Sequence, residues 1–233
     1  MLILIFSIIL LIGLIIAASC YGHLVKTYNK YSSQEAFINF TALQIISKAI
    51  TNYKFNTKIV LTNDNALDNC YVPKKDIIFL SSKVAYSKSI ADISIACHEL
   101  GHTMQNYHKS RLLKLNRFLA FISRFASFLL PILLLTCLVL IFIQEVAFLA
   151  PIFFYVSIGL WLLTWIFRLI TIPLELDASK RAYNVLKEND ILTKKELKIT
   201  KKFLHAAAFT YVGGLFINLY KFYLILKRAF RRN

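Results

Sequence analysis

Residues 89–105 read SIADISIACHELGHTMQ, and this stretch decides how the rest of the chain is expected to fold around it. Ser89 and Asp92 fit the capping-box pattern, in which a serine and an acidic residue three positions later mark the start of a helix. We therefore predict a helix that begins after Ser89 and continues to the end of the quoted stretch. His98 and His102 are four residues apart and share one face of that helix.

Residues 98–102 form an H-E-x-x-H motif, whose two imidazoles can bind one Zn²⁺. Glu99 lies about 100° around the helix from His98, where its carboxylate can act as general base on a water at the metal. We predict one zinc ion per chain, with His98 and His102 as ligands and Glu99 as the catalytic base. The alternative is a pair of surface histidines beside a solvated glutamate.

Small residues surround the motif on the predicted helix. Ala96, Cys97 and Gly101 leave room for a second helix or a substrate to come close. A glycine inside a helix costs about 1 kcal/mol relative to alanine, so Gly101 indicates a close contact.

The composition is typical of a membrane protein. The chain is 58% hydrophobic, its mean hydropathy is +0.59 and its net charge is +16, a combination that soluble domains rarely show. Residues 1–22, 125–144 and 146–167 carry no charged side chain, and each segment is long enough to cross a hydrocarbon core. Residues 203–220 are also free of charge but short and partly polar, and we expect a buried or membrane-surface helix there.

These segments predict a mainly α membrane protein, with transmembrane helices and a small α/β cytoplasmic, zincin-like insert that carries the H-E-x-x-H helix. The expected parts are an N-terminal transmembrane helix at 1–22, the cytoplasmic α/β segment at 23–117, a transmembrane hairpin at 118–172, cytoplasmic helices at 173–202, and a C-terminal hydrophobic helix with a basic tail at 203–233.

The basic residues predict the orientation in the membrane. Residues 22–117 contain 13 Lys or Arg and residues 168–202 contain 9, whereas the turn around Glu145 contains none. Because basic loops stay in the cytoplasm, we expect a multi-pass plasma-membrane protein with a cytoplasmic catalytic part, and Trp161 and Trp165 fit an interfacial anchor. A spanning C-terminal helix would place the basic tail (Lys227, Arg228, Arg231 and Arg232) outside, against this rule.

The positive charge indicates attraction to an anionic lipid bilayer. Nucleic acid is not an expected partner, because the basic residues form no stripe interleaved with aromatic side chains. The four cysteines show no paired spacing and are expected to be free thiols: Cys20, Cys70, Cys97 and Cys137. Residues 17–20 read AASC and leave a lipoprotein signal peptide as an alternative for the N-terminus, although no Lys or Arg follows Met1.

Residues 28–105 have the pattern of a small α/β unit. Thr41 is expected to cap a helix, and residues 58–61 and 77–80 are expected to form short strands around a polar loop with Asn63, Asp64 and Asn65. We expect the second strand to lead into the motif helix. An edge strand beside that helix could bind an extended peptide through main-chain hydrogen bonds; the alternative is ordinary sheet packing.

A catalytic zinc needs a third protein ligand. His108 is six residues after His102 and lies on another side of the same helix. His205 fits a histidine of the hydrophobic core, and Glu145 is expected across the membrane. The remaining candidates lie in the stretch 173–179, PLELDAS.

Glu175 is the favoured third ligand. Pro173 is expected to begin a helix on which Glu175 shares a face with small residues at Ala178, Ser179 and Ala182, so that this face can press against the motif helix. Asp177 is the alternative. It lies about 200° away on such a helix and is expected to meet solvent or the basic pair Lys180 and Arg181.

On these residues the chain resembles the YugP-type membrane neutral zinc metallopeptidase family. The matching stretches are HELGH at 98–102, PKKDIIFLS at 73–81, LELDASKRA at 174–182 and AAFTYV at 207–212, and the resemblance runs from KTYNKY at 26–31 to the basic tail. It implies a neutral zinc peptidase, related in its logic to HtpX-like proteases, in which Glu175 is the third ligand. The family often has Asn where this chain has Asp177, and HtpX-like sites have Asp at the position of Ser179.

The combined prediction is a membrane-bound zinc metalloendopeptidase that hydrolyses a peptide or membrane-protein substrate at the cytoplasmic face. Tyr211 is the candidate donor to the oxyanion, with a structural aromatic side chain as the alternative. One rival function is a site-2-like intramembrane protease, because residues 176–178 resemble its L-D-G motif; charged residues close to the motif on both sides argue against it. The other rival is a non-catalytic membrane scaffold with a relic zinc site.

Overall fold

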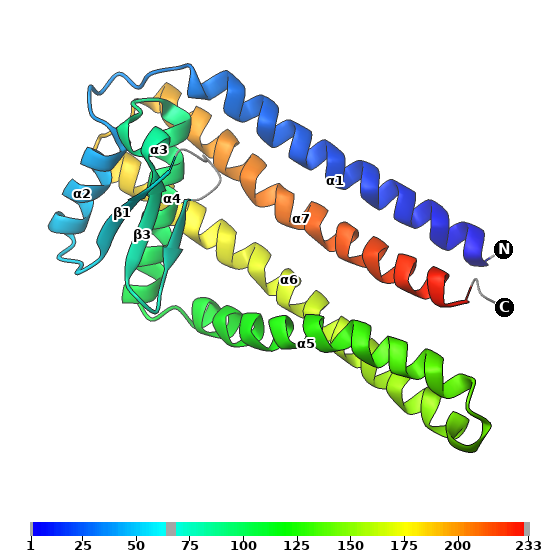
Figure 1. The fold of residues 1–233 in the computed structure, drawn as a ribbon. Coiled ribbons are helices and arrows are strands. Elements are labelled where there is room, and N and C mark those ends of the chain that lie inside the picture. Colours follow the sequence, from blue (N-terminus) through cyan, green and yellow to red (C-terminus); the bar gives the residue numbers. More distant parts are fainter. Residues whose placement is uncertain (1, 64–68, 231–233) are drawn as a thin grey trace. The chain divides into compact units, whose positions relative to one another are not determined.

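The computed structural model describes residues 2–63 and 69–230, and it does not describe the side chains of residues 2–7, 9, 221–222 and 224–230. Asp64 and Asn65 of the predicted loop, and Arg231 and Arg232 of the basic tail, lie outside the described residues. The elements in chain order are α1 (Leu2–Ser32), α2 (Ala42–Asn52), β1 (Lys58–Thr62), β2 (Cys70–Val72), β3 (Ile77–Ser81), α3 (Ser82–Tyr86), α4 (Ile90–Tyr107), α5 (Arg111–Ile141), the short 3-10 helix η1 (Gln144–Leu149), α6 (Ala150–Glu188) and α7 (Lys194–Phe230) (Figure 1). The predicted mainly α class is confirmed.

The chain divides into two compact units. The helical unit comprises Met1–Ala18, Lys114–Ile172 and Tyr211–Asn233, and the sheet unit comprises Ser19–Leu113 and Pro173–Thr210. The helices α1, α5, α6 and α7 each contribute residues to both units.

The helical unit consists of long apolar helices. Four helical segments among the described residues are long and apolar enough to cross a membrane: Leu10–Ser32, Arg111–Ile141, Gln144–Glu188 and Lys194–Tyr220. Three overlap the predicted spans 1–22, 125–144 and 146–167, and the fourth lies in α7. The prediction of a buried or membrane-surface helix at the C-terminus therefore rests on the distribution of basic residues alone, because α7 has the length of a span.

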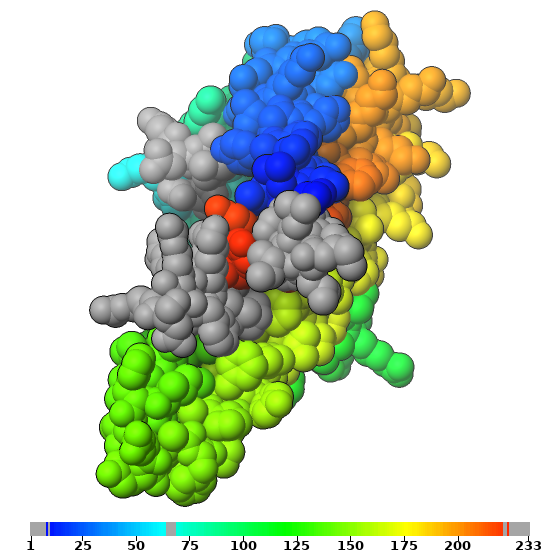
Figure 2. Space-filling model, turned by 90° about the vertical axis from the view of Figure 1, so that its right-hand side faces the viewer, coloured from blue at the N-terminus to red at the C-terminus, as the bar shows by residue number. Residues whose placement is uncertain are grey.

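Small residues allow close helix contacts within the helical unit. A β-carbon on Gly13 would meet the ring of Phe216, and one on Gly213 would meet the backbone of Ala17, so α1 and α7 lie side by side here (Figures 1 and 2). The thiol of Cys137 on α5 donates a hydrogen bond to the carbonyl oxygen of Ala150 at the start of α6 (3.3 Å).

The sheet unit contains a three-stranded sheet in the order β1-β3-β2. The strand β1 pairs with β3 in parallel, and β2 pairs with β3 antiparallel. The two predicted strands are confirmed, but β2 was not predicted, because three residues beside a polar loop give little periodic signal. Because β3 is the central strand, β2 is an edge strand of the sheet. The short helix α3 lies between β3 and α4 in the chain.

Local capping signals set the helices that pack on this sheet. Thr41 caps α2, because its hydroxyl oxygen accepts the N–H of Gln44 while the Gln44 side chain accepts the N–H of Thr41. Ser89 caps α4 by accepting the N–H of Asp92 (3.1 Å), as predicted. Buried apolar residues of α2, α4 and β3, including Ile46, form the core of the unit.

The prediction that Pro173 begins a new helix is wrong. The helix α6 runs from Ala150 to Glu188 with Pro173 inside it. A proline inside a helix removes one backbone hydrogen bond and crowds the preceding turn, at a cost of about 3 kcal/mol. One face of the helix after Pro173 is buried, including Leu174, Ala178 and Ala182, and this packing keeps the helix continuous.

Candidate metal centre

Two helices of the sheet unit bring three potential metal ligands together. His98 and His102 extend from α4, and Glu175 extends from α6. The carboxylate oxygen Oε2 of Glu175 lies 3.1 Å from Nε2 of His98 and 3.5 Å from Nε2 of His102. One ligand atom from each residue lies within 4.8 Å of the other two. We call these three residues the triad.

The spacing of the triad fits a zinc ion. In a tetrahedral site with ligand distances of about 2.0–2.2 Å, neighbouring ligand atoms are about 3.3–3.6 Å apart. The two measured separations from Glu175, 3.1 and 3.5 Å, bracket the lower end of this range. Two imidazoles and one carboxylate are also a common donor set for catalytic zinc. The residues present therefore fit the metal that the motif predicts.

A close contact between α4 and α6 sets the position of Glu175. A β-carbon on Gly101 would collide with the carbonyl oxygen of Ala178, so only glycine fits at this point of α4. Glu175, Ala178, Ser179 and Ala182 are all buried. The small-residue face predicted from the sequence is therefore confirmed as buried, and the contact at Gly101 is the close approach that the sequence indicated.

Each imidazole of the triad is held by a hydrogen bond on its far side. Nδ1 of His98 lies 3.2 Å from Oγ of Ser179, and Nδ1 of His102 lies 2.9 Å from Oε1 of Gln105. Because an amide oxygen only accepts, Nδ1 of His102 is assigned a proton, and Nε2 is the nitrogen that faces Glu175. Such partners orient the ligands of a metal site and fix their tautomers.

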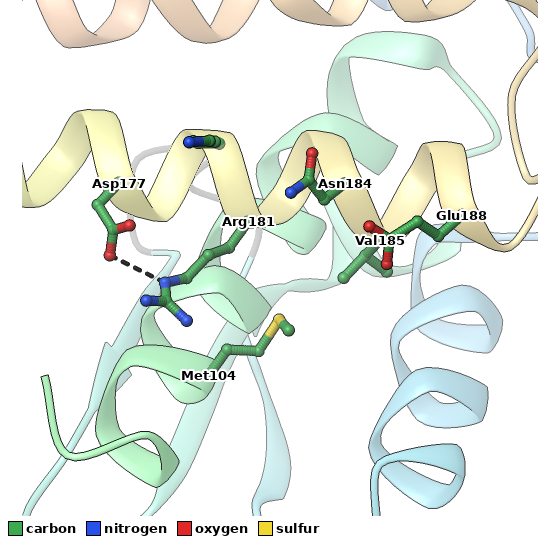
Figure 3. Close-up of a pocket in the computed structure, with 7 residues that line it drawn as sticks. Met104, Asp177, Arg181, Asn184, Val185 and Glu188 are labelled. Carbon is green, nitrogen blue, oxygen red and sulfur yellow. Dashed lines mark hydrogen bonds and ion pairs between the residues drawn. The ribbon is translucent and has the colours of Figure 1, made fainter.

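Gln105 links His102 to a polar chain on α6. Its amide nitrogen donates to the carbonyl oxygen of Leu174 (2.9 Å) and to Oδ2 of Asp177 (2.8 Å), and its side chain is fully buried. The Nε–H of Arg181 donates to the same Asp177 oxygen (2.8 Å) (Figure 3). Asp177 therefore pairs with Arg181, as predicted, and supports the triad through Gln105.

The role of Gln105 was missed in the sequence, although a signal for it exists. Gln105 follows His102 by three residues on one helix, a spacing at which side chains are neighbours. Such a position next to a histidine ligand is where an orienting group is expected. Nothing local marks Ser179 in the same way, because its contact with His98 joins residues 81 positions apart.

Glu99 has the environment of a proton acceptor. Burial raises the pKa of its carboxyl, and this effect outweighs the neighbouring imidazoles of His98 and His102, which lower it. The backbone of Tyr71 in β2 also hydrogen-bonds the carboxylate and acts in the lowering direction. A general base works best when its pKa lies near the working pH, so a raised value suits this task.

The electrostatics of the triad keep Glu175 ionised. Burial alone would raise the pKa of its carboxyl, but the hydrogen bonds from His102 and His98 outweigh burial and lower it. Burial alone would likewise lower the pKa of His102, and the hydrogen bond and charge of Glu175 instead raise it to about 9. An ionised carboxylate is the form that a metal ligand requires.

The other histidines and Tyr211 lie elsewhere. His108 follows α4 as its C-terminal cap, and Nδ1 of its ring accepts from Arg181 (2.9 Å). His205 is exposed, so its prediction as a core histidine is wrong; the buried face of α7 carries Phe203 and Leu204 instead. Tyr211 is the first α7 residue of the helical unit, and its role as an oxyanion donor stays a prediction.

Known proteins share this chain's sequence over most of its length. A family model described as "Putative neutral zinc metallopeptidase" matches residues 4–229. The protein named "Putative membrane protease YugP" from Bacillus subtilis (strain 168) is 29% identical over 202 residues, which cover 84% of each chain. No solved structure matches the chain.

Proposed function

The chain belongs to this zinc metallopeptidase family, and on this premise we propose that it hydrolyses peptide bonds at a membrane with one Zn²⁺ held by His98, His102 and Glu175. The observation that carries the proposal is the triad itself. Residues 77 positions apart meet at a spacing that suits zinc, with the buried carboxyl of Glu99 next to them.

The chemistry follows from the residues around the triad. When bound, Zn²⁺ would lower the pKa of a water to about 7 and polarise the substrate carbonyl. Glu99 takes the proton from the attacking water and later gives it to the nitrogen of the leaving amine. Ser179 and Gln105 keep the two imidazoles oriented through both steps, because each holds the far nitrogen of one ring.

The edge strand β2 is the proposed binding site for an extended peptide. The backbone of Tyr71 reaches Glu99, so a segment paired with this part of the chain would pass beside the general base. The phenol of Tyr71 donates to Asp76 (2.8 Å) and accepts from Asn106 of α4 (2.8 Å). The bond from Asn106 holds β2 against the end of the motif helix, and the bond to Asp76 ties β2 to the turn before β3.

The proposed location is the plasma membrane, with the triad on the cytoplasmic side and an anionic bilayer around the helical unit. The 13 basic residues of 22–117 and the 9 of 168–202 support this orientation. The proposed substrate is a peptide or a membrane protein, with Tyr211 as the proposed donor to the oxyanion. An impermeant thiol label on cysteines placed at Lys109 and Lys194 should react only from the cytoplasm, and one at Glu145 only from outside. Reaction at Lys109 and Lys194 from opposite sides would contradict the orientation.

An intramembrane site-2-like enzyme is less well supported. The motif helix α4 is not among the four described segments that qualify as candidate spans. Asp177, which that class would use as its ligand, is instead paired with Gln105 and Arg181.

The test compares zinc content and peptide hydrolysis of the purified protein with those of Glu99→Gln. The amide keeps the shape of Glu99 but cannot accept the proton, so zinc content should stay unchanged while turnover falls by about 10²–10⁴-fold. Glu188→Gln, an exposed carboxylate of α6, is the matched control and should retain activity. Equal turnover of the protein and of Glu99→Gln would contradict the mechanism, and zinc without any hydrolysis in either would favour the scaffold alternative.

A further inference from the structure

A basic cavity lies between α6 and α7 in the sheet unit, close to the triad. Its volume is about 430 Å³. The residues of its lining that matter here are Leu176, Ser179, Lys180, Lys201, Leu204 and His205. No carboxylate of the described residues lines it, so Lys180 on α6 and Lys201 on α7 give this space a positive charge.

The charges around this cavity lack partners within it. Neither Lys180 nor Lys201 takes part in any of the ion pairs found among the described residues, although Lys180 is near enough to Asp177 to lower the pKa of that carboxyl. Both lysines are exposed, and their charges give the cavity a positive potential that attracts an anion. The cavity therefore favours a negatively charged occupant.

Ser179 connects the cavity to the far side of His98, the side of the ring that faces away from Glu175. Ser179 lines the cavity and also lies 3.2 Å from Nδ1 of His98, and Leu176 directly follows Glu175. One residue of an extended peptide spans about 3.3–3.6 Å, so a substrate whose scissile bond lies at the triad can place a side chain one or two residues away in the cavity. Buried Leu204 offers apolar contact for the methylene groups of such a side chain.

We propose that this cavity binds a carboxylate of the peptide substrate, so that the enzyme prefers Asp or Glu close to the bond it cleaves. This inference rests on the proposed peptidase function. A peptide is a better fit than a lipid headgroup, because every residue of the lining belongs to the sheet unit and the charge-free stretches 1–18, 125–144 and 146–167 belong to the helical unit.

The test uses pairs of fluorogenic peptides that differ only by Glu or Gln at one position near the scissile bond. The unaltered enzyme should show a kcat/KM about tenfold higher for the Glu peptide than for the Gln peptide at one position, because only the Glu carboxylate can form a charged hydrogen bond with a lysine of the cavity. Lys201→Gln should remove this preference and leave the kcat/KM for the Gln peptide unchanged. Lys201→Glu should reverse the preference, so that a Lys peptide is cleaved better than the Glu peptide. Lys202→Gln, an exposed neighbour outside the cavity, should behave like the unaltered enzyme.

A binding experiment separates this proposal from the peptidase function. The Glu and Gln peptides are titrated into the Glu99→Gln protein by fluorescence anisotropy, with and without Lys201→Gln. A preference for the Glu peptide that depends on Lys201 supports the cavity even if hydrolysis is absent. Equal binding and equal cleavage of both peptides would overturn the proposal and leave the peptidase function standing. Weaker binding of Lys201→Gln to phosphatidylserine vesicles, with peptide preference unchanged, would assign the cavity to lipid and also overturn it.

Discussion

The two halves of α6 bury very different surfaces. In the half that belongs to the helical unit, Ile152 and Tyr155 are 57% and 70% exposed, whereas Ala178 and Leu186 in the half that belongs to the sheet unit are 0% exposed. Large apolar side chains are exposed where the surrounding medium is expected to be hydrocarbon, and apolar side chains are buried where a protein partner exists. One continuous helix therefore has the surface expected of a membrane span in its first half and carries the candidate metal ligand Glu175 in its second.

A glycine within the first half of α6 and a glycine of α4 beside the second half show the same contrast. A β-carbon on Gly159, in the first half, would meet nothing within 4 Å, whereas one on Gly101 of α4 would collide with Ala178 in the second half. At these two glycines, a close neighbour is found only beside the second half of α6. The predictions below test whether the second half holds the metal, and how tightly.

The largest effect is expected at the two carboxylates of the second half. Glu175→Gln should weaken zinc binding by more than about 100-fold, because it removes a ligand. Asp177→Asn should weaken it by less than about tenfold, since Asp177 acts only through Gln105. Chelator-competition titrations measure both values. The reverse order would favour Asp177 as the ligand and the intramembrane class.

A smaller effect is expected at Gln105. Gln105→Leu removes the acceptor for Nδ1 of His102 and leaves Asp177 without its amide donor, so zinc affinity should fall by about 10–100-fold. Gln34→Leu, an exposed glutamine of the sheet unit, is the control. A zinc affinity within twofold of that control would show that Gln105 does not orient the ligand.

The smallest effect is expected in stability. Gly101→Ala should destabilise the protein by about 1–3 kcal/mol, because the methyl group has no room beside Ala178. Gly159→Ala should not destabilise it, and the better helix propensity of alanine is worth up to about 1 kcal/mol. Thermal unfolding of the two variants in one detergent gives the comparison. An equal loss in both would mean that the two halves of α6 do not differ in packing.

The features that the sequence predicted well are carried by local signals. The start of α4 follows from the cap at Ser89, and the shared face of His98 and His102 follows from their spacing. Glu175 could be favoured because small residues at helical spacing mark a contact face, and Gly101 marked the opposite side of that contact. The sequence favoured Glu175 as the third ligand and left Asp177 as the alternative.

The features that the sequence missed depend on tertiary contacts. Nothing local predicts that α6 continues through Pro173, because the packing of later residues outweighs the cost of the proline. The three residues of β2 gain their strand conformation from pairing with β3. The sequence placed Ser179 on the face expected to meet the motif helix, but it did not predict the contact with His98, since that contact joins two separate helices.

The most direct test of the central claim is the zinc content of the purified protein. The triad predicts about one Zn²⁺ per chain, measured by elemental analysis after removal of loosely bound metal, and loss of that zinc in both His98→Ala and His102→Ala. Near-full zinc in either variant would contradict the account, because the metal would then be held somewhere other than between α4 and the second half of α6.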